Sequence, residues 1–291
     1  MQGGILIFET RIFRRNSIVL GADFPFNHRM PDWLAIILLG IVEGLTEFLP
    51  VSSTGHLLLA ENTGLLPPQS DLFNVVIQSG AVLAVLAVFA GRVRDLVTRW
   101  SEPVNKDYLA KISVAFLITA VGGLALKKLH FRLPEEAAPV AWASLIGGVL
   151  ILLIEWRLRG RQLGDRITWT IAITVAGAQL LAATFPGTSR SGACILAAMV
   201  IGLSRPVATE FSFLLGVPTL LAAGGLKIVS ALKDGSASQE HWGMVLLGTI
   251  VAAVTAFVVV KWLLRYVQSH TFNAFGWYRI VLGIVILAWL R

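Results

Sequence analysis

Apolar residues occupy most of the chain, and two short polar stretches interrupt them. Each polar stretch divides an apolar segment into two limbs, and these limbs lie at 33–49, 51–66, 167–185 and 191–203. A membrane-spanning helix needs about 20 apolar residues. The first two limbs stop short of that length at Pro50 and at Pro67. We therefore predict re-entrant helical hairpins, whose irregular backbone is tolerated because it lines a cavity.

Longer apolar runs follow each pair of limbs and are typical of transmembrane helices. In the first half they lie at 72–90, 110–127 and 138–156, and in the second half at 208–230, 243–265 and 274–290. Each half therefore contains one hairpin and three crossings. An odd number of crossings inverts the second half relative to the first.

Identical residues support this division, because they recur in the same order and at a constant spacing. The pairs are Trp33 with Trp169, Ile37 with Ile173, Leu45 with Leu181, Pro50 with Pro186, and Ser53 with Ser189. We predict an all-α integral membrane protein with two inverted-topology repeats, at about 31–160 and 165–291. The repeats share one membrane domain, residues 31–291.

The composition agrees with a multi-span membrane protein rather than a soluble domain. Of the 291 residues, 56% are hydrophobic and 14% are charged, and the mean hydropathy is +0.75. The net charge of +7 reflects the bias of Lys and Arg toward the cytoplasmic side of membranes rather than nucleic-acid binding. With only one cysteine, Cys194, no intrachain disulfide forms, and we expect this residue to be a packing side chain.

Residues 1–30 differ from the rest, because they are basic and their apolar content is broken. We expect a disordered or interfacial extension here. A signal peptide is the alternative, but the apolar region at 18–22 is short for one. Met30 is itself a plausible start, so a start-codon assignment error would also explain the extension.

Loop charges give an orientation. The side reached after the first span contains Arg92, Arg94, Arg99, Lys106, Arg157, Arg159, Arg161, Arg166, Arg205 and Arg265. The other side contains the smaller set Lys127, Lys128, Arg132, Lys233 and Arg291. The first side is therefore expected in the cytoplasm, and the first hairpin enters from outside. If the basic residues of the extension at 1–30 are also counted, the two sides have nearly the same number of basic residues.

The first polar stretch, residues 43–56 (EGLTEFLPVSSTGH), gathers carboxylates, hydroxyls and a histidine at membrane depth. Such groups face a cavity or a partner rather than lipid. Glu43 and Glu47 lie one helical turn apart, about 40° apart on one face. Two nearby carboxylates repel, so they require a divalent cation, an arginine or a shared proton, and oxygen ligands suit Mg²⁺ or Ca²⁺. The alternative is a pair of interhelical hydrogen-bonding groups without metal.

Ser53 and His56 are three residues apart and share a face if a helix starts at Ser52 or Ser53. Serine is a nucleophile or a phosphate ligand, and histidine is a general base near neutral pH. The alternative is that Ser52 or Ser53 only caps the helix that follows Pro50. A capped helix N-terminus also offers free N–H groups to an anion, so both roles are compatible.

The second polar stretch, residues 185–192 (FPGTSRSG), is predicted to be a loop that opens a helix. Glycine permits close backbone approach to an anion, and the forked guanidinium of Arg190 matches phosphate oxygens. The alternative role for Arg190 is an ion pair with Glu43 or Glu47 that ties the hairpins together. Expected substrate contacts are Ser52, Thr54, Gln78, Gly187, Thr188, Ser189 and Ser191. Gln78 and Glu210 lie near the starts of predicted spans, and each is equally well explained as a group that supports the residues at the substrate or as a packing hydrogen-bond group.

At these motifs the chain resembles the bacterial undecaprenyl-diphosphate phosphatases, integral-membrane enzymes associated with bacitracin resistance. The resemblance runs through residues 43–56, 73–80 (FNVVIQSG), 185–192, 204–205 (SR) and 210–215 (EFSFLL), and it covers about residues 31–291. Two departures stand out. The extension at 1–30 has no counterpart, and Cys194 stands where threonine is expected.

The resemblance implies hydrolysis of undecaprenyl diphosphate to the monophosphate and inorganic phosphate, which recycles the lipid carrier for cell-wall synthesis. It also implies a divalent cation and an active site open to the outer face of the bacterial plasma membrane. The functional positions of the family fall on Glu43, Glu47, Ser53, His56 and Arg190. A polyprenyl-phosphate flippase or transporter is the competing class, which the inverted repeat suggests by fold analogy alone. The oligomeric state stays open, with a homodimer as one alternative.

Overall fold

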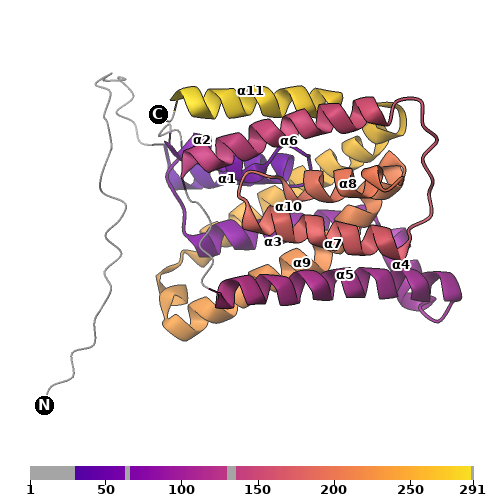
Figure 1. Ribbon diagram of the computed structural model, residues 1–291. Helices are drawn as coiled ribbons and strands as arrows, with labels where there is room; N and C mark the ends of the chain where they lie inside the picture. The colour runs from indigo at the N-terminus through magenta and orange to yellow at the C-terminus, as the bar shows by residue number, and fades with distance from the viewer. Residues whose placement is uncertain (1–29, 63–65, 130–135, 290–291) are drawn as a thin grey trace, which may run out of the picture. The chain divides into compact units, whose positions relative to one another are not determined.

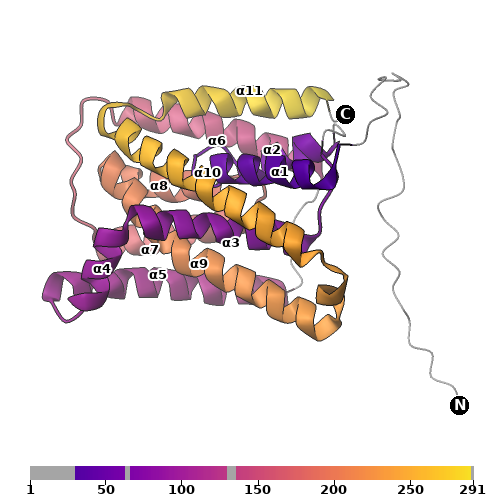
Figure 2. The ribbon, with the colours of Figure 1, turned by 180° about the vertical axis from the view of Figure 1, so that it is seen from behind.

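The computed structural model describes residues 30–62, 66–129 and 136–289, and the fold is that of Asp32–Arg291. In these residues the chain forms α-helices and one 3₁₀ helix, with no strand (Figures 1 and 2). In chain order they are α1 (Asp32–Thr46), α2 (Ser53–Asn62), α3 (Asp71–Val88), α4 (Ala90–Thr98), α5 (Pro103–Lys128), α6 (Ala137–Arg157), α7 (Trp169–Thr184), α8 (Arg190–Val200), α9 (Arg205–Asp234), η1 (Ser236–Gln239), α10 (Trp242–Ser269) and α11 (Asn273–Trp289). The expected extension falls on residues 1–29, outside the described part.

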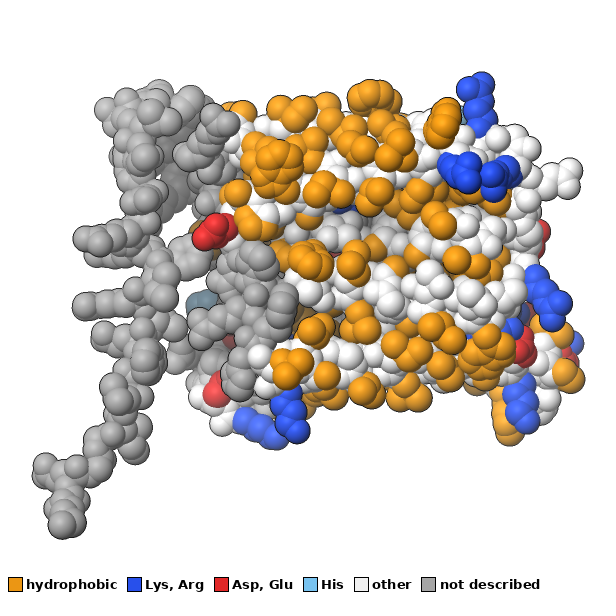
Figure 3. Space-filling view, viewed as in Figure 1, with side chains coloured by type: hydrophobic (Ala, Val, Ile, Leu, Met, Phe, Trp, Pro, Cys, Tyr) orange, Lys and Arg blue, Asp and Glu red, His pale blue; other side chains and the backbone are white. Residues whose placement is uncertain are grey.

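The predicted all-α membrane class is confirmed. Helices α3, α5, α6, α9 and α10 are long and apolar enough to cross a membrane, and α11 is a shorter apolar helix. Large apolar side chains lie exposed on these helices, among them Leu117 (55%) and Val254 (63%). Figure 3 shows apolar side chains over the middle of one face and charged side chains toward its two ends. A surface of this kind is stable against hydrocarbon and unfavourable in water.

Helix boundaries follow from residues that satisfy terminal backbone groups. Ser70 caps α3 by accepting a hydrogen bond from the amide of Phe73 (3.0 Å), and Thr168 caps α7 through the amide of Ile171 (3.3 Å). Helix α9 ends at Gly235, whose φ of +79° is left-handed. Side chains that accept from free N–H groups and a glycine after the last turn are the ordinary ends of helices.

Helices α1 and α2 form the first predicted hairpin, and α7 and α8 form the second. In Figure 1 the first hairpin reaches the interior from the left end of the bundle and the second from the right. Their tips meet there, because the hydroxyls of Ser191 and Ser189 donate to the carbonyl of Leu49 at 3.0 and 3.5 Å. The structure therefore brings the two polar stretches together. The inverted symmetry of the two halves stays a prediction.

Both tips have the same local structure. Ser52 (φ +73°) and Ser189 (φ +65°) are the described non-glycine residues with left-handed backbone. Each serine hydroxyl accepts from the amide three residues later, that of Gly55 at 3.4 Å and that of Gly192 at 3.2 Å. A left-handed conformation is strained for serine, at a cost of order 1 kcal/mol, and persists where surrounding contacts fix it.

These caps correct the sequence alignment of the tips by one residue. The structural counterpart of Ser189 is Ser52, so the pairing of Ser53 with Ser189 is wrong. The constant spacing of the repeat aligned Ser53 with Ser189, and the backbone angle that distinguishes Ser52 from Ser53 has no sequence signal. As a consequence, Ser53 and Arg190 occupy matching positions, the first residues of α2 and α8.

Small residues allow the helices that carry the site to cross closely. Gly40 and Gly44 of α1 face α10, where a side chain at Gly44 would lie 2.6 Å from the carbonyl oxygen of Ala252. Gly148 of α6 faces α11, and its added Cβ would lie 2.6 Å from the carbonyl oxygen of Gly276. Close backbone approach at small residues replaces the hydrophobic effect as the source of helix association in lipid.

The sequence pattern missed helix α4 and set the start of α5 too late. Helix α4 occupies residues assigned to a loop, and α5 begins at Pro103 rather than near residue 110. Both differences lie in charged segments, because a hydropathy pattern finds only the part of a helix that crosses lipid. In α4, Arg92 packs over the ring of Tyr108 of α5 at 4.6 Å, which holds the two helices together.

The α1–α10 crossing makes a prediction about stability. Gly44→Ala should destabilise the protein by about 1–3 kcal/mol, because the new methyl group meets helix backbone that cannot move aside. The matched control is Gly225→Ala in α9, where an added Cβ has nothing within 4 Å. That variant should be neutral or gain up to about 1 kcal/mol from helix propensity. Thermal unfolding in detergent measures both, and equal stabilities would contradict this packing.

Candidate active site

The two hairpin tips enclose a cavity of about 270 Å³ together with α3, α5, α7 and α9. The sequence-predicted residues that line it are Glu47, Ser52, Ser53, Thr54, Gln78, Gly187, Thr188, Ser189 and Arg190. The structure thus brings residues from both polar stretches to one space. Glu43, His56 and Ser191 do not line this cavity, although each lies next to a residue of the tips.

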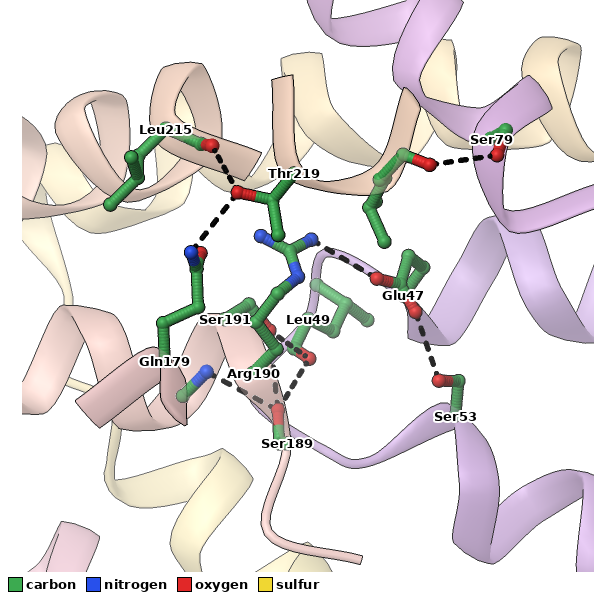
Figure 4. Close-up of polar contacts among 12 residues, drawn as sticks. Glu47, Leu49, Ser53, Ser79, Gln179, Ser189, Arg190, Ser191, Leu215 and Thr219 are labelled. Atoms are coloured by element: carbon green, nitrogen blue, oxygen red, sulfur yellow. Dashed lines mark hydrogen bonds and ion pairs between the residues drawn. The ribbon is translucent and has the colours of Figure 1, made fainter. Parts of the chain in front are cut away.

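Glu47 is the centre of the polar cluster (Figure 4). Its Oε1 accepts from Arg190 Nη2 at 3.0 Å, and its Oε2 accepts from Ser53 Oγ at 3.0 Å. The carboxylate is buried, at 8% exposure. A carboxylate that accepts from a serine hydroxyl is placed to take up its proton, so the neighbour of Ser53 with base character is Glu47.

Arg190 joins the hairpins and keeps donors free. Its ion pair with Glu47 is the structural role that the sequence left as an alternative. Nε and Nη1 are buried and have no hydrogen-bond partner among the described residues. Gly216 of α9 makes room for the group, because a Cβ there would lie 3.0 Å from Arg190 Cζ. A buried guanidinium with unused N–H groups beside a cavity is suited to an anionic ligand.

Glu43 lies one turn before Glu47 and is completely buried. Neither of its carboxylate oxygens has a hydrogen-bond partner in the described part of the chain. Its electrostatic neighbours are Glu47 and Arg190. A buried carboxylate without a partner is costly, so it requires a proton or a cation.

The described residues contain no group of three or more His, Cys, Asp or Glu side chains that would enclose a metal ion. Mg²⁺ nevertheless binds many enzymes through one or two carboxylates, with water and substrate phosphate completing its shell. Glu43 and Glu47 fit that pattern, because the unpartnered oxygens of Glu43 lie beside Glu47.

Backbone groups add to the anion site. Helices α2 and α8 both begin at the cavity, at Ser53 and Arg190. The first N–H groups of a helix have no intrahelical acceptor, and the helix dipole places partial positive charge there. Two helix N-termini that meet at one cavity favour an anion such as phosphate.

His56 is oriented away from the hydroxyl of Ser53. Its Nδ1 lies 2.7 Å from the carbonyl oxygen of Ser52, and its Nε2 lies 2.6 Å from the hydroxyl of Tyr278. A carbonyl only accepts, so Nδ1 carries the proton and donates it, and Nε2 of the neutral ring accepts from Tyr278. The rings of His56 and Tyr278 also stack, with centroids 5.6 Å apart.

Other predicted positions have structural partners. Ser191 is fully buried and ties the tips together through Leu49. Glu210 forms a 3.7 Å ion pair with Arg92, away from the cavity, which fits its packing role. Gln78 lines the cavity, and its contact with a substrate stays a prediction.

Several polar residues near the tips were missed from the sequence. Gln179 lines the cavity and donates to the hydroxyls of Thr119 and Thr219 at 3.0 Å each. Arg279 lies beside the tips and is 1% exposed. Both had a usable signal, a polar side chain inside an apolar run. Thr119 and Thr219 had none, because threonine is common in helices of this kind.

Comparison with known proteins shows the family to which this chain belongs. Residues 36–285 match the family described as bacitracin resistance protein BacA. The chain is 51% identical over 257 residues to a protein of Rhizobium etli (strain CIAT 652) named undecaprenyl-diphosphatase, an alignment that covers 88% of this chain and 96% of the relative. It is 50% identical over 262 residues to a protein of the same name from Xanthomonas oryzae pv. oryzae (strain PXO99A), with coverages of 90% and 98%.

A third relative, from Xylella fastidiosa (strain 9a5c), has the same name and is 49% identical over 262 residues, covering 90% of this chain and the whole of that protein. The matches include both hairpins and every helix that lines the cavity, because they run through most of the membrane domain. The chain therefore belongs to the bacitracin resistance protein BacA family.

Proposed function

We propose that this protein hydrolyses undecaprenyl diphosphate to undecaprenyl phosphate and inorganic phosphate. The observation that carries the proposal is the cluster of Glu47, Ser53 and Arg190 at a cavity where two helix N-termini meet. The relatives named undecaprenyl-diphosphatase supply the substrate class. Hydrolysis breaks the bond between the bridging oxygen and the terminal phosphorus, and a water oxygen ends on the released phosphate.

The residues have distinct tasks in this reaction. Arg190 and the first amides of α8 bind the terminal phosphoryl group and stabilise charge on its equatorial oxygens. Glu47 takes a proton from the attacking group. That group is either the Ser53 hydroxyl, which would form a phosphoserine that water then hydrolyses, or a water molecule that Ser53 positions. In both routes the leaving group is the lipid monophosphate.

A divalent cation, Mg²⁺ or Ca²⁺, belongs to the proposal. Glu43 and Glu47 would hold it, since Glu43 is the buried carboxylate without a partner. When bound, such an ion neutralises phosphate charge as a Lewis acid. Without the ion Glu43 would need a proton, because a second negative charge beside Glu47 is costly in a buried site where Arg190 is already paired with Glu47.

The protein is a multi-pass membrane protein. We place it in the bacterial plasma membrane with the cavity open to the outer face. This orientation is supported by the larger set of basic loop residues on the side expected in the cytoplasm. The reaction would then recycle the lipid carrier for cell-wall synthesis.

The direct test is release of inorganic phosphate from undecaprenyl diphosphate by the purified protein. Chelation of divalent cations should abolish the release, and added Mg²⁺ should restore it. A pure lipid transporter would bind the substrate and release no phosphate, which would overturn the proposal. Glu47→Gln is the control for contaminating phosphatases, because it removes the carboxylate that joins Ser53 to Arg190.

Arg190→Lys tests the geometry of the guanidinium. A lysine keeps the charge but cannot hold Glu47 and a phosphate with one planar fork. We expect turnover to fall at least about 100-fold, the loss typical of removing one oxyanion donor. Near-normal turnover in the steady-state assay would show that Arg190 supplies charge alone.

Ser53→Ala and His56→Ala test the two groups of the first hairpin. We expect Ser53→Ala to lower kcat about 10²–10⁴-fold with little change in KM, because attack and proton transfer occur in the transition state while the prenyl tail supplies binding. The same pattern is expected for His56→Ala, whose ring holds the Ser52 carbonyl.

Rapid quenching with terminally labelled substrate then identifies the attacking group. Label trapped on Ser53 would establish a phosphoserine, and its repeated absence would assign the attack to water. Full activity in Ser53→Ala would show that Ser53 has no role in the reaction and only begins helix α2.

A further inference from the structure

Arg279 of α11 uses every donor of its guanidinium on backbone carbonyls. The group is 1% exposed. Its Nε donates to Ser144 at 3.3 Å, Nη1 to Pro50 at 3.4 Å and Thr188 at 2.9 Å, and Nη2 to Ala143 at 3.0 Å and Gly187 at 2.9 Å. A guanidinium has five N–H donors, so its capacity is filled. Within the described residues no salt bridge involves Arg279.

The five acceptors belong to three separate elements. Pro50 lies in the first hairpin tip, Gly187 and Thr188 lie in the second, and the remaining two carbonyls belong to α6. The three tip carbonyls lie outside the helices, where a buried acceptor needs another partner. Arg279 supplies that partner to both tips at once and fixes them against α6.

This contact also sets the direction of the tip amides. A trans peptide points its C=O and N–H to opposite sides, and the described residues contain no cis peptide. Because the carbonyl of Thr188 faces Arg279, the N–H of Ser189 points away from it. That N–H has no acceptor among the described residues, and Ser189 lines the cavity.

We propose that Arg279 is a positioning residue for the active site, which clamps both hairpin tips by their carbonyls and so aims the amide of Ser189 in the second tip at the phosphate site. This role rests on the proposed phosphatase function for its kinetic consequence. The clamp acts through the backbone, whereas Arg190 acts through its own unused donors.

Gly147 of α6 gives a way to move the clamp without removing it. An added Cβ at this position would lie 2.6 Å from Arg279 Cζ and 3.0 Å from its Nε. Its nearest neighbours are the end of a side chain rather than backbone, so Gly147→Ala should displace the guanidinium and leave the helix pair intact. Gly123→Ala in α5 is the matched control, because its Cβ has nothing within 4 Å.

The experiment compares Arg279→Lys, Gly147→Ala and Gly123→Ala with the wild type in detergent. Steady-state kinetics should show kcat reduced about 10- to 100-fold in the first two variants, since small misplacements of positioned groups cost up to about 100-fold. KM should stay within about threefold, and Gly123→Ala should match the wild type. A merely structural role would lower the amount of folded enzyme, which active-site titration corrects, and would not change kcat selectively.

Amide hydrogen exchange followed by mass spectrometry tests the clamp without using activity. Peptides covering residues 47–53 and 185–190 should exchange faster in Arg279→Lys and in Gly147→Ala, and at the wild-type rate in Gly123→Ala. Unchanged exchange in both clamp variants would overturn the proposal. Faster exchange with unchanged kcat would overturn the positioning role. If the wild type released no phosphate, the proposed function would fall, while the exchange data would still decide whether Arg279 holds the tips.

Discussion

A helix that stops inside a membrane leaves terminal N–H and C=O groups without partners, and hydrocarbon supplies none. Among the described residues four such ends lie at the hairpin tips, where α1 and α7 stop and where α2 and α8 begin. The tips satisfy these groups in three ways: serine hydroxyls cap the starting helices, Ser191 donates to Leu49 of the other tip, and Arg279 of α11 donates to carbonyls of both tips. The positions of the site residues in the tips depend on these contacts.

The same constraint produces the chemistry. Arg279 donates hydrogen bonds to backbone carbonyls of the tips, while the first amides of α2 and α8 lie at the cavity. Donors that cannot be satisfied by the fold are therefore available to a phosphate, together with the free nitrogens of Arg190. Such donors need no reorganisation when charge develops on the substrate, which is the physical basis of electrostatic catalysis.

Much of this could be predicted from the sequence, because charge and backbone-breaking residues are expensive in lipid and mark a site wherever they occur. That argument found Glu47, Ser53 and Arg190, and it placed the hairpins. It could not find the direction of His56, since a spacing of three residues does not decide which neighbour a ring contacts. It also aligned Ser53 with Ser189, because a left-handed serine at 52 has no signature in the sequence. Arg279 was overlooked although its signal, one arginine in an apolar run, was of the same kind.

Arg190 and Arg279 thus have separate tasks in the site, and a glycine makes room for each of them. Gly216 leaves space for Arg190 and Gly147 leaves space for Arg279, so each guanidinium lies where a helix has no side chain. Their hydrogen bonding separates their roles. Arg190 is paired with a carboxylate and keeps Nε and Nη1 unused, which suits a group that must bind and release an anion. All five N–H donors of Arg279 form hydrogen bonds with backbone carbonyls, which suits a group that must not move. A substrate phosphate can therefore compete for Arg190 without loosening the tips that surround it.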